Sequence, residues 1–458
     1  MAEHNFDVVI LGGGSGGYAA ALRSAQLGLS VALIERDKLG GTCLHRGCIP
    51  TKALLHSAEV ADVTREAASY GVQASLQGID MPAVNKYRDG IIDRLFKGLT
   101  GLVGSKQITV VSGEGRMVGQ KSISVNGDTY TGKNLVLATG SFSKTLPGLD
   151  IAGRVITSDQ ALQLDFVPEK AIVLGGGVIG VEFASIWKSF GCDVTIIEGL
   201  PTLVPNEDPA VSKALERAYR KRGINFKTGV KFSGVQQSAT GVIVSLENGE
   251  SFDAELLLVA VGRGPNTAGF GYEENGVNMD RGYVLTNERL ETSISGVYAA
   301  GDIVPGLQLA HRGFQQGIFI AEEIAGLKPV AIDELGIPKV TYCEPEIASV
   351  GLSEPKAAEM YGAENISVYE YNLGGNGKSQ ILGTAGFIKL IRRNNGPVIG
   401  IHMIGSRVGE QVGEAQLIVN WEAFPEEVAS LVHAHPTQNE ALGEAHLALA
   451  GKPLHAHA

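Results

Sequence analysis

The chain contains two copies of one β-α-β unit, and this repeat is the strongest constraint on its fold. The first copy spans residues 6–35 and the second spans residues 171–198. In each copy an apolar strand enters a glycine-rich turn, a helix follows, and a second strand ends on a glutamate. The first glycine and this glutamate are 23 positions apart in both copies, from Gly12 to Glu35 and from Gly175 to Glu198. Such units predict an α/β fold with two parallel, Rossmann-like sheets.

The glycine spacing indicates that each unit binds a dinucleotide. In the first copy we expect Gly12 to turn the chain, Gly14 to let the backbone approach a pyrophosphate, and Gly17 to let helix and strand pack closely. The helix N-terminus offers unpaired N–H groups to the phosphates, and Glu35 can accept hydrogen bonds from a ribose. The second copy repeats these positions with Gly175, Gly177, Gly180 and Glu198.

The second unit is expected to prefer NAD over NADP. A carboxylate at Glu198 repels a 2′-phosphate, and an arginine or lysine is needed to hold one. The residues after Glu198, GLPTLVP, contain neither.

Two cysteines follow the first unit directly. Cys43 and Cys48 lie in the run GGTCLHRGCIPTK, residues 40–52. Two thiols beside a redox cofactor indicate a disulfide that is formed and broken in each turnover. Because disulfide chemistry and hydride chemistry meet through a carrier that handles both, we expect FAD in the first unit and NAD in the second.

The segment between these cysteines is not expected to be regular helix. Residues five apart in an α-helix have Cα atoms about 8.6 Å apart, whereas a disulfide requires roughly 4.4–6.8 Å. We therefore expect a distorted turn, for which Gly47 and Pro50 are suitable residues. A structural disulfide or two independent core cysteines are the alternatives. Zinc is disfavoured because no second Cys/His pair has ligand spacing, so no metal site is expected.

Four domains are expected along the chain. Strands at 134–141 and 256–266 complete the two units, and segments 123–132 and 241–250 are expected to be antiparallel hairpins that cover the sheets. A buried strand at 295–304 should return to the first domain, which makes the second unit an insertion. The predicted domains are 1–145 (FAD-binding), 146–267 (NAD-binding), 268–338 (central, completing the FAD domain) and 339–458. The last is expected to be α+β, with strands at 339–345, 386–393 and 398–405 and helices at 409–423 and 439–451.

Composition excludes several classes of partner. The net charge of the 458 residues is −11 and no basic cluster occurs, which disfavours nucleic acid and anionic membranes. No apolar run approaches the about 20 residues of a membrane span. The N-terminal residues enter a strand almost at once and leave no room for a leader peptide. With only four cysteines, of which Cys192 and Cys343 are expected in the core, we expect a cytoplasmic protein.

These motifs follow one another as in the pyridine nucleotide–disulfide oxidoreductases, and the chain resembles that family over essentially its whole length. The segments that carry the resemblance are GGTCLHRGCIPTK, ATGS, GGGVIGVE, VGRGPNT, AAGDIV, LAHRGFQQG and HAHPTQNEALGEA. The resemblance implies FAD, NAD, central and interface domains in a homodimer. The pattern is most similar to that of members that oxidise dihydrolipoamide with NAD⁺.

The resemblance also implies roles for single residues. Cys43 is similar to the interchange thiol that meets the substrate, and Cys48 to the thiol that contacts the flavin. Lys52 resembles a lysine beside the flavin that pairs with a glutamate, here Glu182. Further implied FAD contacts, beside the first glycine turn and Glu35, are Thr42, Lys52, Gly115, Thr139, Gly140, Asp302 and Ala310. Further implied NAD contacts, beside the second turn and Glu198, are Val230 and Gly262.

His435 stands five residues before Glu440, as the family's catalytic base stands before its orienting glutamate. An imidazole near a thiol raises its thiolate fraction, and a carboxylate fixes the tautomer of the ring. In the family this pair reaches the disulfide of the partner subunit, so monomers should be inactive. His433 is expected to support the pair or to be structural, and His311 and His402 are expected to be structural.

The resemblance implies lipoyl domains as substrates and an acyltransferase core of a 2-oxoacid dehydrogenase complex, or a glycine-cleavage lipoyl protein, as partner. A glutathione- or mycothiol-type disulfide reductase and a mainly assembling subunit are the alternatives. Reductases with a C-terminal cysteine pair are disfavoured because no cysteine follows Cys343. Two segments depart from the usual pattern. Leu44-His45-Arg46 replaces Leu-Asn-Val between the cysteines, and the loop GGNGKSQ at 374–380 differs from the common one.

Overall fold

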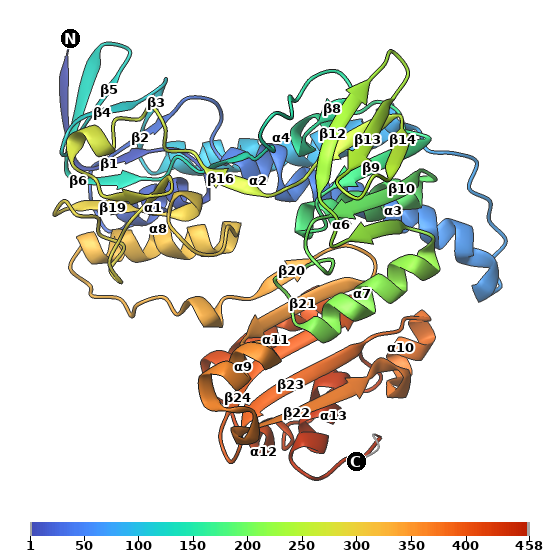
Figure 1. The fold of residues 1–458 in the computed structure, drawn as a ribbon. Coiled ribbons are helices and arrows are strands. Elements are labelled where there is room, and N and C mark those ends of the chain that lie inside the picture. Colours follow the sequence, from blue (N-terminus) through green and yellow to red (C-terminus); the bar gives the residue numbers. More distant parts are fainter. Residues whose placement is uncertain (1, 456–458) are drawn as a thin grey trace.

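The protein is described by a computed structural model that covers residues 2–455, and these form three lobes (Figure 1). The first lobe is built on a seven-stranded sheet of order β3-β2-β1-β6-β5-β4, with β19 paired to β6. Its strands are β1 Glu3–Leu11, β2 Val31–Glu35, β3 Thr109–Ser112, β4 Arg116–Gly119, β5 Ser122–Val125, β6 Asp128–Leu137 and β19 Val297–Ala299. Helices α1 (Ser15–Gln26) and α8 (Ala310–Ile324) pack together on one face of it.

The central strands of this sheet are buried on both faces, and for this reason residues 8–11 of β1 and 31–34 of β2 read as continuous apolar runs. Val8, Val9 and Ile10 have no exposed surface. The strand β19 pairs in parallel with β6, which confirms that segment 295–304 returns to the first sheet after the second unit. The expected domain boundaries at 145/146, 267/268 and 338/339 remain predictions.

One hairpin prediction for this lobe needs correction. Segment 123–132 does form an antiparallel hairpin of β5 and β6, but it does not cover the sheet. Its second strand continues as β6 into the expected strand at 134–141, so that one strand pairs with both β5 and β1. The hairpin therefore extends the sheet at its edge.

The second lobe holds a five-stranded parallel sheet of order β11-β10-β9-β15-β8. Its elements are β8 Val155–Ile156, β9 Lys170–Leu174, α6 Val178–Phe190, β10 Asp193–Glu198, α7 Pro209–Arg222, β11 Asn225–Thr228 and β15 Leu256–Val259. An antiparallel sheet of β12 Phe232–Gln237, β13 Val242–Leu246 and β14 Ser251–Ala254 includes the hairpin expected at 241–250. The two β-α-β units are thus confirmed as parallel, while the first sheet also carries β5 and β4 in antiparallel pairing at its edge.

The third lobe is a five-stranded antiparallel sheet of order β20-β21-β24-β23-β22 with helices. Its elements are β20 Lys339–Thr341, β21 Glu346–Gly351, α9 Glu354–Tyr361, β22 Ile366–Asn372, α10 Gly377–Leu382, β23 Phe387–Arg393, β24 Val398–Gly405, α11 Val408–Asn420, α12 Pro425–Val428 and α13 Glu440–Leu449. This confirms the α+β prediction. The expected strand at 339–345 ends early, because residues 342–345 form the turn into β21. Cys343 lies in this turn and is 1% exposed.

The other elements of the described residues lie within the lobes or between them. These are α2 Gly41–Arg46, α3 Cys48–Glu66, α4 Met81–Ser105, α5 Ser158–Ala161, β7 Ser141–Ser143, β16 Arg263–Pro265, β17 Met279–Asp280, β18 Tyr283–Val284 and the 3₁₀ turns η1 Ala67–Tyr70, η2 Glu273–Asn275, η3 Gly301–Ile303, η4 Glu334–Gly336, η5 Ala363–Asn365 and η6 Leu373–Gly375. Among the helices of the described residues, none combines the length and apolarity needed to cross a membrane.

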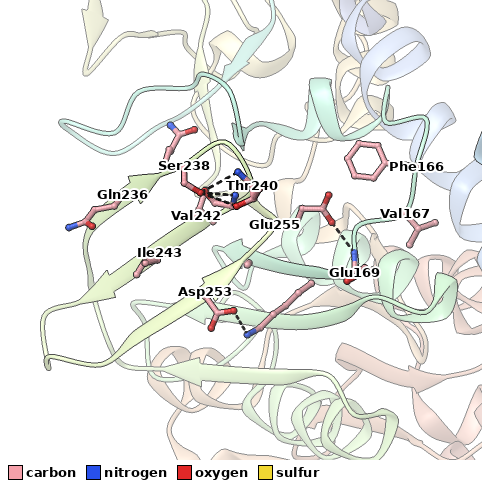
Figure 2. A pocket seen from close by; sticks show the side chains of 14 residues that line it. Phe166, Val167, Glu169, Gln236, Ser238, Thr240, Val242, Ile243, Asp253 and Glu255 are labelled. Atoms are coloured by element: carbon pink, nitrogen blue, oxygen red, sulfur yellow. Dashed lines mark hydrogen bonds and ion pairs between the residues drawn. The ribbon is translucent and has the colours of Figure 1, made fainter.

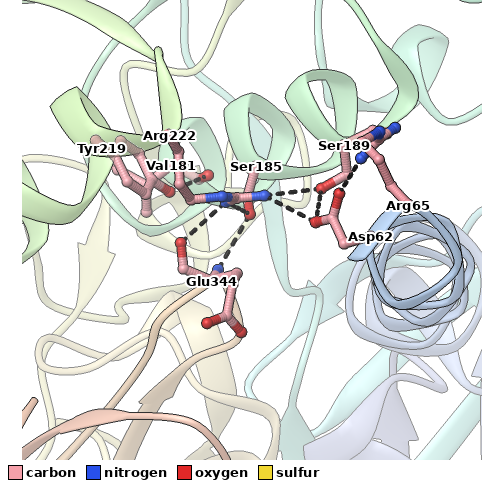
Figure 3. Close-up of polar contacts among 8 residues, drawn as sticks. All are labelled: Asp62, Arg65, Val181, Ser185, Ser189, Tyr219, Arg222 and Glu344. Atoms are coloured by element: carbon pink, nitrogen blue, oxygen red, sulfur yellow. Dashed lines mark hydrogen bonds and ion pairs between the residues drawn. The ribbon is translucent and has the colours of Figure 1, made fainter. Parts of the chain in front are cut away.

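Arg222, at the end of α7, joins the second lobe to α3 and to the third lobe (Figure 3). Its guanidinium donates to Ser185 Oγ at 2.8 Å and Ser189 Oγ at 2.8 Å, both on α6. It also donates to Asp62 Oδ2 on α3 at 3.1 Å and to the carbonyl of Glu344 in the third lobe at 2.9 Å. Helix α3, which begins at Cys48, is therefore held against α6 and against the turn before β21.

Candidate active site

The first glycine turn has the shape of a phosphate cradle. A Cβ on Gly12 or Gly17 would lie 2.2 Å from Ala138 O or 1.8 Å from Gly12 O, so packing within the protein requires both glycines. In front of Gly14, in contrast, the nearest atom is 4.0 Å away. Gly14 is the N-cap of α1 and no side chain caps that helix. The free N–H groups at an open helix N-terminus fit a pyrophosphate.

Glu35 closes this turn at the end of β2. Its Oε2 accepts the N–H of Gly13 at 2.7 Å, and its Oε1 accepts the N–H of Asp37 at 2.8 Å. A small cavity beside it is lined by Gly12, Glu35, Gly115 and Thr139. A side chain at Gly115 would meet that of Leu11 at 2.6 Å. The structure therefore brings four of the residues expected at the FAD site together around one cavity.

The remaining residues expected at the FAD site lie along the elements that surround this turn. Ser141 Oγ donates to Asp302 Oδ2 at 2.5 Å, which links β7 to η3. Thr139 Oγ1 donates to the carbonyl of Asn266 at 2.6 Å. Gly140 has a φ of 75°, Thr42 lies in α2, and Ala310 is the first residue of α8.

The second glycine turn reproduces the first. A Cβ on Gly175 would lie 2.4 Å from Ala260 O and one on Gly180 would lie 1.9 Å from Gly175 O, whereas nothing lies within 4 Å in front of Gly177. Glu198 accepts the N–H groups of Gly176 at 2.6 Å and Leu200 at 2.7 Å. The N–H of Val230 donates to the carbonyl of Glu198 at 3.3 Å, and Gly262, with a φ of 106°, follows β15. This turn also fits a dinucleotide.

The two cysteines lie on either side of a helix break. Helix α2, which holds Cys43, ends at Arg46, and α3 begins at Cys48. Gly47 between them has φ −142° and ψ −108°, and a Cβ there would approach Thr42 O to 3.1 Å. Pro50 lies in the first turn of α3, where no backbone N–H is needed. The expected distortion is thus confirmed at Gly47.

The break brings the two thiols close enough for each to shift the pKa of the other. Both cysteines carry free thiols in this structure. The hydrogen bond from Cys43 and the positive charge of Lys52 lower the pKa of Cys48 to about 7 against the opposing effect of burial. The same contact raises the pKa of Cys43, and burial adds to this shift. Cys48 is therefore the sulfur that ionises first.

Lys52 is one turn after Cys48 on α3, and its ammonium donates to both carboxylate oxygens of Glu182 at 2.9 Å. This confirms the expected pairing across α3 and α6. Glu182 is 3% exposed and also accepts the N–H of Tyr342 at 2.9 Å. Burial lowers the pKa of Lys52, but the attraction of Glu182 outweighs it and the pKa is raised. The buried pair therefore holds a fixed positive charge next to Cys48.

Tyr342 was not singled out in the sequence analysis. Its ring lies 4.7 Å from Lys52 Nζ, a cation–π distance. Tyr342 comes from the third lobe and its N–H donor and ring both face the Lys52–Glu182 pair. No pattern in the sequence could have indicated this contact, because the residues lie on three separate elements.

His435 and Glu440 form the expected pair. His435 Nδ1 lies 2.7 Å from Glu440 Oε1, and the histidine side chain is 77% exposed. Helix α13, which begins at Glu440, lies at the far end of the third lobe from α2 and α3 (Figure 1). The pair and the cysteines are therefore far apart within one chain.

The other three histidines considered in the sequence analysis have partners within the protein. His433 Nε2 lies 2.9 Å from Glu414 Oε1, and this hydrogen bond raises the pKa of His433. His402 is 1% exposed, contacts the carbonyl of Leu352, and has its pKa lowered by burial. The ring of His311 contacts the carbonyl of Pro338 at 2.7 Å.

A groove of about 790 Å³ lies elsewhere, on the second lobe between β12–β14 and residues 166–170 (Figure 2). Several of its charged groups are paired within the protein. Lys170 donates to Asp253 at 2.9 Å, and Glu255 accepts the N–H of Glu169 at 3.1 Å. None of the site residues expected from the sequence lines it. The volume of this groove therefore does not identify the candidate active site.

The position of Lys52 predicts a measurable shift in the ionisation of Cys48. Replacing Lys52→Met removes the neighbouring positive charge, so the pKa of Cys48 should rise from about 7 by about one unit. A pH titration of thiolate absorbance in the dithiol protein measures this. Lys38→Met, at an exposed lysine of the loop after β2, is the control and should leave the titration unchanged. An unshifted titration in Lys52→Met would show that this charge does not act on Cys48.

Comparison with known proteins places the chain in a family. Residues 6–317 match the family described as pyridine nucleotide-disulphide oxidoreductase, and residues 337–446 match its dimerisation domain, which supports a homodimer. A dihydrolipoyl dehydrogenase of Bacillus subtilis is 41% identical, with 98% of this chain and 99% of that protein covered. A mitochondrial dihydrolipoyl dehydrogenase of Pisum sativum is 38% identical, with 98% and 92% covered.

A solved structure agrees with this similarity. The crystal structure of LpdA from Mycobacterium tuberculosis superposes with a TM-score of 0.90 at 26% sequence identity and covers 98% of this chain and 100% of that one. The fold expected from the sequence, two Rossmann-like domains and a C-terminal dimerisation domain, is confirmed. The chain belongs to the pyridine nucleotide-disulphide oxidoreductase family.

Proposed function

We propose that this chain is a dihydrolipoyl dehydrogenase, a flavoprotein that oxidises dihydrolipoamide to lipoamide and reduces NAD⁺. The observation that carries the proposal is the contact between the Cys43 and Cys48 sulfurs beside the Lys52–Glu182 pair. The similarity to dihydrolipoyl dehydrogenases over nearly the full length supports the choice of substrate.

The cysteine pair accepts electrons from the substrate in two steps. With the pair oxidised, a substrate thiolate attacks Cys43 Sγ, the Cys43–Cys48 bond breaks, and Cys48 leaves as a thiolate. The second substrate thiol then attacks the mixed disulfide, which releases lipoamide and leaves Cys43 reduced. The Lys52 ammonium stabilises the negative charge on Cys48, in keeping with the lowered pKa of this thiol. Two electrons have then moved from substrate to protein.

Bound FAD would supply the two-electron and hydride chemistry that links the thiols to NAD⁺. We assign its binding to the first glycine turn with Glu35, Thr42, Lys52, Gly115, Thr139, Gly140, Asp302 and Ala310. We assign NAD to the second turn with Glu198, Val230 and Gly262. The Glu198 carboxylate favours NAD over NADP, because it would repel a 2′-phosphate.

His435 is the proposed base that takes the proton from the substrate thiol, and Glu440 holds its ring. Their distance from the cysteines within one chain supports an arrangement in which His435 serves the cysteine pair of the partner subunit. Each active site would then contain residues from both subunits.

The physiological partners belong to the same proposal. A thiol substrate carried on a lipoyl domain implies either the acyltransferase core of a 2-oxoacid dehydrogenase complex or a glycine-cleavage lipoyl protein. We place the protein in the cytoplasm. Nothing in the charge pattern suggests nucleic acid or a membrane as partner.

Turnover with defined substrates tests this function. Under anaerobic conditions the purified yellow protein should reduce NAD⁺ with dihydrolipoamide. It should not reduce glutathione disulfide with NADH or NADPH. Cys48→Ser should lower the dihydrolipoamide rate by at least about 10³-fold, since no Cys43–Cys48 disulfide can then form to accept the electrons. A fully active Cys48→Ser variant, or glutathione disulfide as the better substrate, would contradict the proposal.

Mixed dimers test whether the two subunits share the site. Cys48→Ser and His435→Gln should each be inactive as homodimers. A heterodimer of the two, purified through two different tags, has one intact site and should recover about half of the wild-type activity. A heterodimer as inactive as its parents would show that His435 serves its own chain.

A further inference from the structure

We propose that Asn376 is a positioning residue for the catalytic histidine, and that it acts through Thr437 and Glu440. Asn376 lies in the loop 374–380, one of the two segments that depart from the usual family pattern. The inference rests on the function proposed above, because it concerns the loop that carries His435.

Asn376 uses its side-chain amide to join two segments. It is 3% exposed and caps α10, where its Oδ1 accepts the N–H of Ser379 at 2.8 Å and the hydroxyl of Ser379 at 2.9 Å. Its Nδ2 donates to the carbonyl of Thr437 at 3.0 Å. An amide has both acceptor and donor groups. One buried side chain therefore connects the start of α10 to the loop that carries His435, residues 433–440, which we call the histidine loop.

Thr437 connects Asn376 to His435 through the carboxylate of Glu440. The N–H of Thr437 donates to Glu440 Oε2 at 2.7 Å, and the other carboxylate oxygen of Glu440 contacts His435 Nδ1 at 2.7 Å. Thr437 is therefore held at both its carbonyl and its N–H. A shift of this residue would move Glu440 and with it the histidine ring.

Other contacts hold the ends of the loop. Glu414 on α11 contacts both His433 and the side chain of Asn439. Gln438 donates to the carbonyl of Ser406 at 2.6 Å. Asn376 adds the contact at Thr437, between these two ends. Because the ring of His435 is 77% exposed, its orientation depends on Glu440 more than on packing.

The chain offers a matched control on the same loop. Asn372 Oδ1 accepts the N–H of Gly374 at 2.8 Å and caps η6, much as Asn376 caps α10. Among the hydrogen bonds of residues 2–455, none joins Asn372 to residues 433–440. Serine is a good N-cap but is shorter than asparagine. Asn376→Ser therefore keeps the N-cap of α10 but loses the hydrogen bond to the carbonyl of Thr437. Asn372→Ser keeps the N-cap of η6 and changes no contact of the histidine loop.

The test compares two reactions of the holoenzyme. One is the oxidation of dihydrolipoamide by NAD⁺, which needs a base. The other is the oxidation of NADH by ferricyanide, which takes electrons without deprotonating a thiol. Asn376→Ser should lower kcat for dihydrolipoamide about 10-fold or more, part of the 10²–10⁴-fold that a placed base contributes. KM should change less than about twofold and the ferricyanide rate should be unchanged, because Asn376 contacts neither substrate nor the cysteines. Asn372→Ser should match wild type in both reactions.

Several results would overturn the positioning role. One is full dihydrolipoamide activity in Asn376→Ser, and another is an equal loss in both reactions. Loss of FAD or of the unfolding transition would also overturn it, since Asn376 would then be a purely structural residue. A wild-type protein that fails to oxidise dihydrolipoamide would refute the proposed function itself, and the inference with it.

Discussion

The structure depends on the helix break at Gly47. A continuous helix from Gly41 to Glu66 would hold the Cα atoms of Cys43 and Cys48 about 8.6 Å apart, too far for their sulfurs to react with each other. The end of α2 at Arg46 and the new start at Cys48 turn one sulfur toward the other. Redox chemistry at this pair is possible because glycine permits the break and Pro50 is tolerated in the new first turn.

The ion pair of Lys52 and Glu182 makes the helix break useful for thiol chemistry, because it places a positive charge beside Cys48. Burying either charge alone would be costly, so each requires the other. Since Lys52 is on α3 and Glu182 on α6, the pair also joins α3 to the second lobe, and Tyr342 adds the third lobe. The same contact that holds the lobes together fixes a positive charge beside Cys48. Arg222 reinforces this junction from the same face of α6, at Ser185 and Ser189, and from the carbonyl of Glu344. The same residues therefore contribute both to the packing between the lobes and to the lowered pKa of Cys48.

The sequence predicts most of the fold and the local pairs of the site. The glycine spacing reveals both parallel sheets, because close packing of strand and helix allows no Cβ at Gly17 or Gly180. The pair of His435 and Glu440 follows from its spacing within a single loop. The β5–β6 hairpin is recognised, but its continuation into a central strand is not, since alternation in a short segment does not show where a strand ends.

Contacts between distant elements leave no periodic signal, and the sequence could not predict them. Tyr342 reaches Glu182 across 160 positions, and Asn376 reaches Thr437 across 61. Both arise from the way the lobes and loops pack. The separation of His435 from the cysteines likewise emerges only from the fold, and it supports the proposal that each active site of the dimer uses residues of both subunits.

The central claim is that Cys43 and Cys48 exchange two electrons with the substrate as one pair. Peptide mapping by mass spectrometry, with alkylation at low pH, measures this directly. In air-oxidised protein a Cys43–Cys48 disulfide should be found, and after anaerobic dihydrolipoamide both cysteines should be alkylated while Cys192 and Cys343 remain free thiols throughout. If Cys43 and Cys48 stay reduced in the oxidised protein, or stay linked after the substrate is added, the account is wrong.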